Sequence, residues 1–212
     1  MPNPTEKTYG DLNVAYDFFN NILFDGRLPR CLITMQRRAG AYGYFAGDRF
    51  GTRDGHETTD EIALNPAHLK ERTTQETFST LVHEMTHLEQ HHFGQPSRNG
   101  YHNKQWAELM KKVGLFPSET AQPGGKETGQ RVSHYIVPGG LFDIACAELL
   151  NEGVSLDYVE MWSETDEGKK ARKTKAASKT KYTCPACSLN AWAKPDVLLV
   201  CGECQEELQA ED

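Results

Sequence analysis

The sequence predicts an α+β protein with a small zinc-binding segment near its C-terminal end. Three observations support this class: a helical pattern followed by short strand patterns, a strongly helical central segment, and two C-x-x-C pairs after residue 180. With 212 residues, of which 38% are hydrophobic, the chain can form one globular domain of ordinary size and a small appendage.

Charge and hydropathy exclude several kinds of protein. The net charge is −7, unlike the positive field of a dedicated duplex-DNA-binding protein. No apolar run approaches the roughly 18 residues that cross a bilayer, and the N-terminal residues lack a secretion signal. We therefore expect a cytoplasmic protein without a membrane span, associated with the nucleoid if the source is bacterial.

The first part of the chain predicts a helix beside a small sheet. Apolar residues recur at helical spacing over residues 11–24, and Asp25-Gly26 ends the pattern. Candidate strands follow at residues 31–37, 42–45 and 61–65, separated by turns that contain glycine.

The central segment predicts the clearest helix. Thr73 and Glu76 have the spacing of a capping box at its start, and Gly94 closes it. His83 and His87 lie off the axis of its apolar stripe, so they can face a cleft while the stripe faces the core. The stripe consists of Phe78, Leu81, Val82, Met85 and Leu88.

The rest of the first domain is patterned more weakly. A second helix is expected at residues 103–113, a loop at 118–130, a strand at 132–137 and a further helix at 142–150.

The motif His83-Glu84-Met85-Thr86-His87 indicates a metal site. Positions i and i+4 share a helix face, so the two imidazoles can bind one zinc ion. Glu84 is placed to act as general base on a water that zinc activates. The motif therefore predicts hydrolysis of a peptide-like bond.

The third zinc ligand has several candidates, since zinc in hydrolases usually keeps three protein ligands and one open position. His102 is favoured because it follows a glycine turn and begins the second predicted helix. Glu108 and a further histidine of the central helix, His91 or His92, remain alternatives. The residues three and six positions after the motif are not glycine and histidine, which excludes the metzincin pattern.

An oxyanion stabiliser is also required for acyl transfer. His134 and Tyr135 are candidates on residue type alone. A surface or packing role is the more ordinary interpretation of His134.

The cysteines divide into two kinds. Four form two C-x-x-C pairs separated by thirteen residues, a spacing that suits a tetrahedral zinc ion held by four thiolates. A redox C-x-x-C is the alternative, but no βαβ pattern surrounds either pair. Cys31 and Cys146 stand alone and are expected to be buried thiols. The paired residues are Cys184, Cys187, Cys201 and Cys204.

The segment Lys169–Lys181 carries seven basic residues and no acidic residue. It predicts a flexible linker that could contact nucleic-acid phosphates, with a solvated spacer as the alternative. Beyond it, Tyr182, Trp192 and Lys194 could offer stacking and phosphate contacts, although the favoured position of Trp192 is the core of the zinc-binding segment. An apolar strand is expected at residues 197–200.

Together these motifs resemble the SprT-like metalloproteases, which include the Spartan-type proteases. The similar segments are Phe19-Asn20, Phe24-Asp25-Gly26-Arg27-Leu28-Pro29, Glu61–Asn65, the His83–His87 motif, His102…Trp106 and the four-cysteine module. Asn103 departs from the pattern, because the family commonly has glycine there. The resemblance covers most of residues 10–116 and 182–204.

The resemblance implies a zincin-like fold for the first domain, a ribbon for the cysteine module, and DNA-dependent proteolysis of proteins, often those crosslinked to DNA. We expect a metalloprotease domain at residues 1–162, a basic linker at 163–181 and a zinc ribbon at 182–212, with one catalytic and one structural zinc ion. The alternatives are an antirestriction-like module that binds DNA or a partner without proteolysis, and a small-substrate hydrolase such as a deformylase or aminopeptidase.

Overall fold

The computed structural model describes residues 3–98, 100–161 and 179–211 and has mixed helices and strands, as an α+β chain does. The chain divides into two compact units, Met1–Met161 and Trp162–Asp212. Within the described ranges, no helix combines the length and apolarity that crossing a membrane requires.

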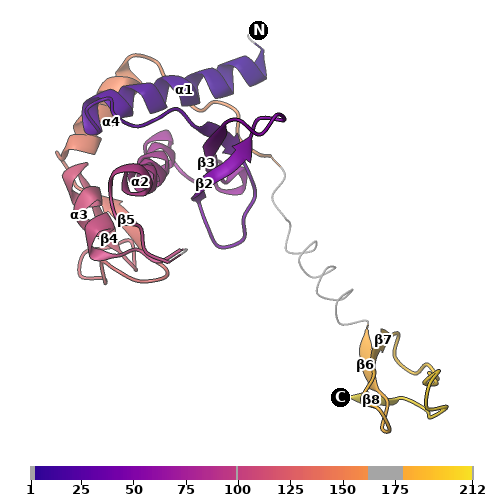
Figure 1. Ribbon diagram of the computed structural model, residues 1–212. Coiled ribbons are helices and arrows are strands. Elements are labelled where there is room, and N and C mark those ends of the chain that lie inside the picture. The colour runs from indigo at the N-terminus through magenta and orange to yellow at the C-terminus, as the bar shows by residue number, and fades with distance from the viewer. Residues whose placement is uncertain (1–2, 99, 162–178, 212) are drawn as a thin grey trace. The chain divides into compact units, whose positions relative to one another are not determined.

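The first unit places helix α2 at its centre (Figure 1), where it contacts β2, β3, α1, α3 and α4. The helices are α1 (Pro4–Leu23), α2 (Thr74–Phe93), α3 (Lys104–Lys112) and α4 (Leu141–Asn151), with a short 3-10 helix, η1, at Pro66–His68. The strands are β1 (Leu32–Met35), β2 (Gly43–Gly51), β3 (Thr58–Leu64), β4 (Leu115–Ser118) and β5 (Ser133–Ile136).

The main sheet has the order β1-β3-β2. Strand β3 lies in the middle, parallel to β1 and antiparallel to β2, and its residues from Asp60 to Leu64 are buried. Strand β2 is therefore an edge strand, and its register with β3 shifts between Ala46 and Phe50. Strands β4 and β5 form a separate antiparallel pair.

Helix α2 forms as its sequence predicts. Thr73 and Glu76 make the reciprocal bonds of a capping box, and Gly94 is the C-cap. The predicted apolar stripe is fully buried. Phe78 of this stripe packs edge-on against Phe19 of α1, with ring centroids 5.9 Å apart. This packing holds the opposite face of α2 toward the histidine site.

The turn after α1 is fixed by hydrogen bonds to α1 and by an ion pair to α2. The Asn20 side chain bonds both the backbone N–H and the backbone C=O of Leu28, each at 3.1 Å. Tyr16 donates its hydroxyl to the Pro29 carbonyl at 2.5 Å, and Arg27 forms an ion pair with Glu89 of α2. The segment from Phe19 to Pro29 thus has a structural role, because it connects α1 to α2.

Several elements differ from the predicted ones, and the clearest cases are α1, β2 and β4. Helix α1 begins at Pro4, because Asn3 caps it by accepting from the Thr5 N–H at 3.0 Å and proline suits the first helical position. Strand β2 continues past residue 45 to Gly51, and β4 precedes the predicted loop. Pairing with β3 and β5 creates these strands, and pairing partners cannot be read from local periodicity.

The second unit has an antiparallel sheet of order β7-β6-β8, made by β6 (Thr180–Thr183), β7 (Asn190–Ala193) and β8 (Gln209–Glu211). The predicted strand at 197–200 was wrong, because within it only Val200 forms an isolated bridge, to Glu207. The apolar side chains there are not a buried face, since Leu198 is 70% exposed. Most of the predicted linker, residues 163–178, lies outside the described residues.

Candidate metal centres

Three histidines meet beside α2. His83 and His87 are one turn apart on that helix, and His102 lies just before α3. Each offers a ring nitrogen, and these nitrogens lie within 4.8 Å of one another. The ring centroids are 4.9 to 5.5 Å apart. The local turn of α2 and the return of the chain at α3 together create a donor set that suits one zinc ion.

Trp106 forms the apolar support of this cluster. It is fully buried, and its ring lies 4.3 Å from His102, 4.9 Å from His83 and 5.1 Å from His87, measured between centroids. Burial lowers the pKa of His83 well below its usual value and that of His87 to about 3. Both rings are therefore neutral near pH 7, which is the form that binds a metal.

A hydrogen-bond chain orients His83. The Ser79 hydroxyl donates to the Glu76 carbonyl at 2.8 Å, so its oxygen accepts from His134 Nε2–H at 2.9 Å. His134 Nδ1 is then unprotonated and accepts from His83 Nδ1–H at 3.0 Å. The chain leaves the lone pair of His83 Nε2 for a metal.

His102 is oriented by the backbone. Its Nδ1–H donates to the Gly129 carbonyl at 3.2 Å, which leaves Nε2 as the metal donor. Asn103 follows as the N-cap of α3 and accepts from the Trp106 N–H at 3.0 Å. Its φ of −89° does not require glycine, so the departure from the family pattern is compatible with this cap.

Glu84 lies buried in the same cleft as the histidines. Burial raises the pKa of its carboxyl to about 8, opposed in part by the charge of Arg38 and by the backbone N–H of Phe45. Gly43 of β2 allows this approach, because a Cβ there would lie 2.8 Å from the Ala63 carbonyl oxygen and 3.3 Å from Glu84 Oε1. The edge strand therefore passes directly beside the carboxyl group.

The cleft has a volume of about 1210 Å³. The three histidines, Glu84 and His134 line it, together with residues 37–47. Its lining is rich in cationic side chains, despite the negative charge of the whole chain. These are Arg37, Arg38, Arg49, Arg98 and Arg131.

Other predicted candidates lie elsewhere. Glu108 is 66% exposed and pairs with Lys111 at 3.1 Å, so it points away from the histidine cluster. Tyr135 stacks on Phe116 at a centroid distance of 5.3 Å and does not line the cleft. His134 does enter the site, in contact with His83, rather than lying at the surface.

Sequence reasoning missed the Ser79–His134 chain. Ser79 lies four residues before His83, and that spacing is visible in the sequence. His134 is 51 residues from His83, and only the position of β5 brings the two together.

The four cysteines of the second unit form a second donor cluster, with sulfur atoms within 4.8 Å of one another. Cys187 Sγ and Cys201 Sγ are 3.7 Å apart. A tetrahedral zinc ion with bonds of about 2.3 Å separates its sulfurs by roughly 3.8 Å, whereas a disulfide requires about 2 Å. The cluster therefore fits a zinc ion and not a disulfide.

The two cysteine pairs have the same backbone design. The N–H of Cys184 donates to the Leu189 carbonyl at 2.9 Å, and that of Cys201 to the Glu206 carbonyl at 2.8 Å. Ser188 and Gln205, each four residues after the first cysteine of its pair, have a positive φ of 60°. Backbone N–H groups of Cys204 and Glu203 lower the pKa of Cys201 to about 7, which favours the thiolate that zinc binds.

The favoured position of Trp192 was wrong. Its side chain is 62% exposed, while Tyr182 is 3% exposed and forms the small core with Leu208. The Tyr182 hydroxyl also donates to the Lys194 carbonyl at 2.9 Å. Trp192 is thus accessible for stacking, and Tyr182 is not.

The lone cysteines are both removed from these clusters. Cys146 is buried and Cys31 is half-buried. Burial raises the pKa of each thiol to about 12, so both remain protonated at neutral pH.

Comparison with known proteins is consistent with this site. The model of the SprT-like family matches residues 12–123, and the chain belongs to this family. The family is associated with zinc metallopeptidase activity. An "Uncharacterized protein in mucB 3'region" of Salmonella typhimurium is 52% identical over 59 residues, which are 28% of this chain and 80% of that protein.

Proposed function

We propose that this chain is a zinc-dependent endopeptidase of zincin-like fold that cleaves DNA-associated proteins. The observation that carries the proposal is the meeting of three neutral imidazoles and one buried carboxyl group in a single cleft. A purely structural zinc site has no need of the carboxyl group. In this proposal His83, His87 and His102 hold the catalytic zinc ion, and the four cysteines hold a structural one.

Glu84 is the proposed general base. A bound zinc ion would supply Lewis-acid chemistry, polarising a carbonyl and acidifying a water molecule. Glu84 accepts the proton of the attacking water and returns it to the leaving amine. Burial raises the pKa of this carboxyl group to about 8 in the zinc-free protein, and the charge of a bound zinc ion would lower it toward the ionised form that accepts a proton.

The position of strand β2 favours an extended polypeptide as the substrate. It is the edge of the sheet, so within the described part of the chain no strand pairs with one side of its backbone, and residues 43–47 line the cleft beside Glu84. An extended peptide can pair with such an edge and present its carbonyl to the histidines. The cleft volume also exceeds the range of about 300–1,000 Å³ that is common for small-molecule pockets.

The DNA-associated part of the proposal rests on the family resemblance and on charge. The five arginines of the cleft and the basic segment Lys169–Lys181 can both contact phosphates. The exposed Trp192 can stack on an unpaired base. We propose that DNA concentrates the enzyme on proteins bound to the same strand.

The decisive experiment combines the purified full chain with a DNA-binding protein, with and without single-stranded DNA. We expect cleavage with DNA in the wild type and strongly reduced cleavage in Glu84→Gln. Glu108→Gln, which changes an exposed glutamate outside the cleft, is the matched control and should cleave normally. DNA binding without cleavage would favour the antirestriction-like alternative, and DNA-independent cleavage of short substrates would favour a small-substrate hydrolase.

A further inference from the structure

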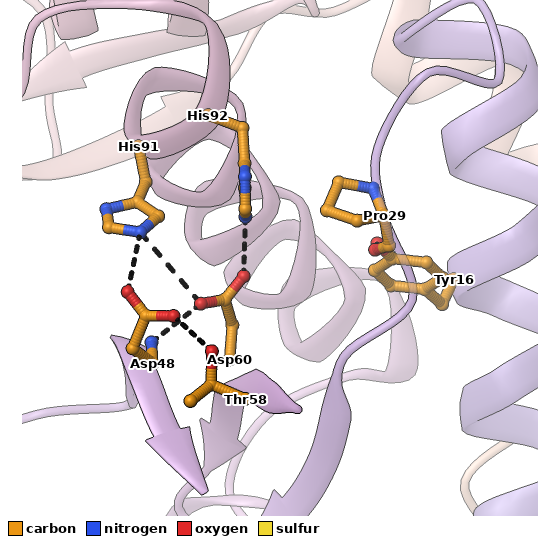
Figure 2. A network of polar contacts seen from close by, with 7 residues as sticks. All are labelled: Tyr16, Pro29, Asp48, Thr58, Asp60, His91 and His92. Carbon is orange, nitrogen blue, oxygen red and sulfur yellow. Dashed lines mark hydrogen bonds and ion pairs between the residues drawn. The ribbon is translucent and has the colours of Figure 1, made fainter. Parts of the chain in front are cut away.

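We propose that Asp48, Asp60, His91 and His92 form a separate structural site for a divalent cation of the Zn²⁺ type. Figure 2 shows the four side chains converging where the end of α2 meets β2 and β3. Asp60, His91 and His92 offer donor atoms within 4.8 Å of one another, in a group distinct from the His83 cluster. The proposed peptidase activity does not require this site.

The donor separations are close to those of a tetrahedral site. His92 Nε2 lies 2.6 Å from Asp60 Oδ2, and His91 Nε2 lies 3.7 Å from Asp48 Oδ2 and 4.0 Å from Asp60 Oδ1. Donors about 2 Å from a tetrahedral zinc ion are roughly 3.3 Å apart. The two separations of His91 are slightly longer than this value, while the 2.6 Å contact of His92 with Asp60 is a hydrogen bond that a bound ion would replace.

Both carboxylates are already oriented by other groups. Asp60 Oδ1 accepts the backbone N–H of Asp48 at 2.8 Å, and Asp48 Oδ1 accepts the Thr58 hydroxyl at 2.7 Å. In each case the other carboxylate oxygen faces a histidine (Figure 2). Hydrogen bonds of this kind commonly fix the outer oxygen of a metal-binding carboxylate.

Charge also favours a cation here. Asp60 is only 4% exposed, and among the described residues its ion-pair partners are His91 and His92. A buried carboxylate requires a compensating positive charge. A divalent ion would balance the charges of Asp48 and Asp60, whereas the competing explanation is a hydrogen bond from the His92 ring to Asp60 without a metal.

The backbone of β2 is shaped around His91. A Cβ at Gly47 would lie 2.7 Å from the His91 ring, so only glycine permits this approach without displacement. The next residue, Asp48, has a φ of 50°, a conformation that a residue with a side chain rarely adopts. Both residues lie in the register shift of β2, which turns Asp48 toward the helix.

A site with four protein ligands has no open position for substrate, which marks it as structural. It would join the end of the helix that carries His83 and His87 to the edge strand. Gly47 and His91 both line the cleft, so the ion would hold one wall of the cleft in place.

The test is the zinc stoichiometry of the full chain. Metal-free protein is equilibrated with Zn²⁺ by dialysis, and bound zinc is measured for wild type, Asp60→Asn, His92→Gln and Asp48→Asn. Each variant should bind one ion fewer than the wild type. His56→Gln and Asp54→Asn, which change exposed residues of the adjacent turn, should bind as many ions as the wild type. Asp48→Asn keeps the test valid if the buried change at Asp60 prevents folding.

A second measurement separates a bound metal from a hydrogen bond between histidine and aspartate. In the His87→Ala background, which removes a ligand of the proposed catalytic site, the imidazole nitrogen resonances of His91 and His92 are followed during addition of Zn²⁺ at pH 7.5. We expect both Nε2 resonances to move to metal-bound positions at one ion per site. Unchanged stoichiometry in all three variants, or His91 and His92 resonances that do not respond to zinc, would overturn the proposal. Neither result depends on peptidase activity.

Discussion

The histidine site beside α2 and the cysteine site of the second unit are built in opposite ways. The histidine site lies inside a folded unit, where Trp106 and the Ser79–His134 chain hold neutral rings in place. The cysteine site lies in a unit whose buried core is Tyr182, Leu208 and two of the cysteines themselves. The first site is positioned by the protein, while the second provides much of the structure around it.

This difference implies that zinc has two roles in one chain. At the histidine site the fold supplies the geometry, so in the proposed function a zinc ion would be required for chemistry rather than for folding. In the cysteine unit the buried apolar residues are too few to offset the entropy of ordering the segment, so metal binding and folding are one process.

The largest effect is expected from Cys184→Ser. It removes one ligand of the cysteine site, and the second unit should lose its fold completely while the first unit stays folded. Amide resonances of residues 179–211 measured by NMR would show this. His87→Ala is the contrasting variant, and it should lose one zinc ion without unfolding either unit. Equal loss of structure in the two variants would contradict the comparison.

Glu84→Gln should reduce peptide-bond cleavage by about 10²–10⁴-fold, the usual contribution of a general base. Zinc content should not change, because Glu84 is not among the proposed ligands. The measurements are single-turnover cleavage rates and metal analysis of the same preparation. A variant that loses zinc as well would indicate that Glu84 has a ligand or structural role.

Acid should destabilise the zinc-free first unit. His87 and His134 have pKa values of about 3 in the folded protein, against about 6.5 when unfolded. The stability that depends on their neutral forms is fully present above pH 6.5. As the pH falls below this value, the free energy of unfolding decreases by about 1.4 kcal/mol per histidine per pH unit. Urea unfolding between pH 7.5 and 4.5 would measure it.

Glu84 acts in the opposite direction over part of that range. Burial raises the pKa of Glu84 to about 8 in the zinc-free protein. The contribution of this group to the free energy of unfolding therefore falls as the pH rises from about 4.5 to 8, because the folded state disfavours the ionised carboxylate. Glu84→Gln should therefore make the acid-induced loss steeper between pH 6.5 and 4.5. An unchanged slope would show that this carboxyl group is not buried in the metal-free state.

His134→Phe should weaken zinc binding at the histidine site by about 10–100-fold. A planar aromatic ring is kept, but the acceptor for His83 Nδ1–H is lost, so His83 is no longer held in the tautomer that exposes Nε2. Chelator competition would measure the affinity. Tyr135→Phe, one residue away and stacked on Phe116, is the control and should bind zinc normally.

The smallest effect on stability is expected from Trp192→Ala. Because the side chain is 62% exposed, the stability of the second unit should change by less than about 0.5 kcal/mol. Binding of single-stranded DNA should weaken by about 1–3 kcal/mol if the indole stacks on a base. Tyr182→Ala is the opposite case, since it removes the buried ring and should unfold the same unit.

Features set by short-range spacing were predictable from the sequence. The i, i+4 geometry of a helix determined that His83 and His87 share a face, and the apolar stripe determined which side of α2 packs into the hydrophobic core. The capping box and the two C-x-x-C pairs are equally local. These features depend only on the rise and twist of one helix or on the length of one turn.

The remaining features depend on contacts between distant segments. Only the tertiary structure decided that His102 rather than Glu108 approaches the helix, that His134 reaches His83 across 51 residues, and that His91 and His92 face Asp60 instead of the motif. It also decided that Tyr182, not Trp192, fills the core of the second unit. Local periodicity assigns a residue to a face of its own element, whereas its partner is set by the packing of the whole chain.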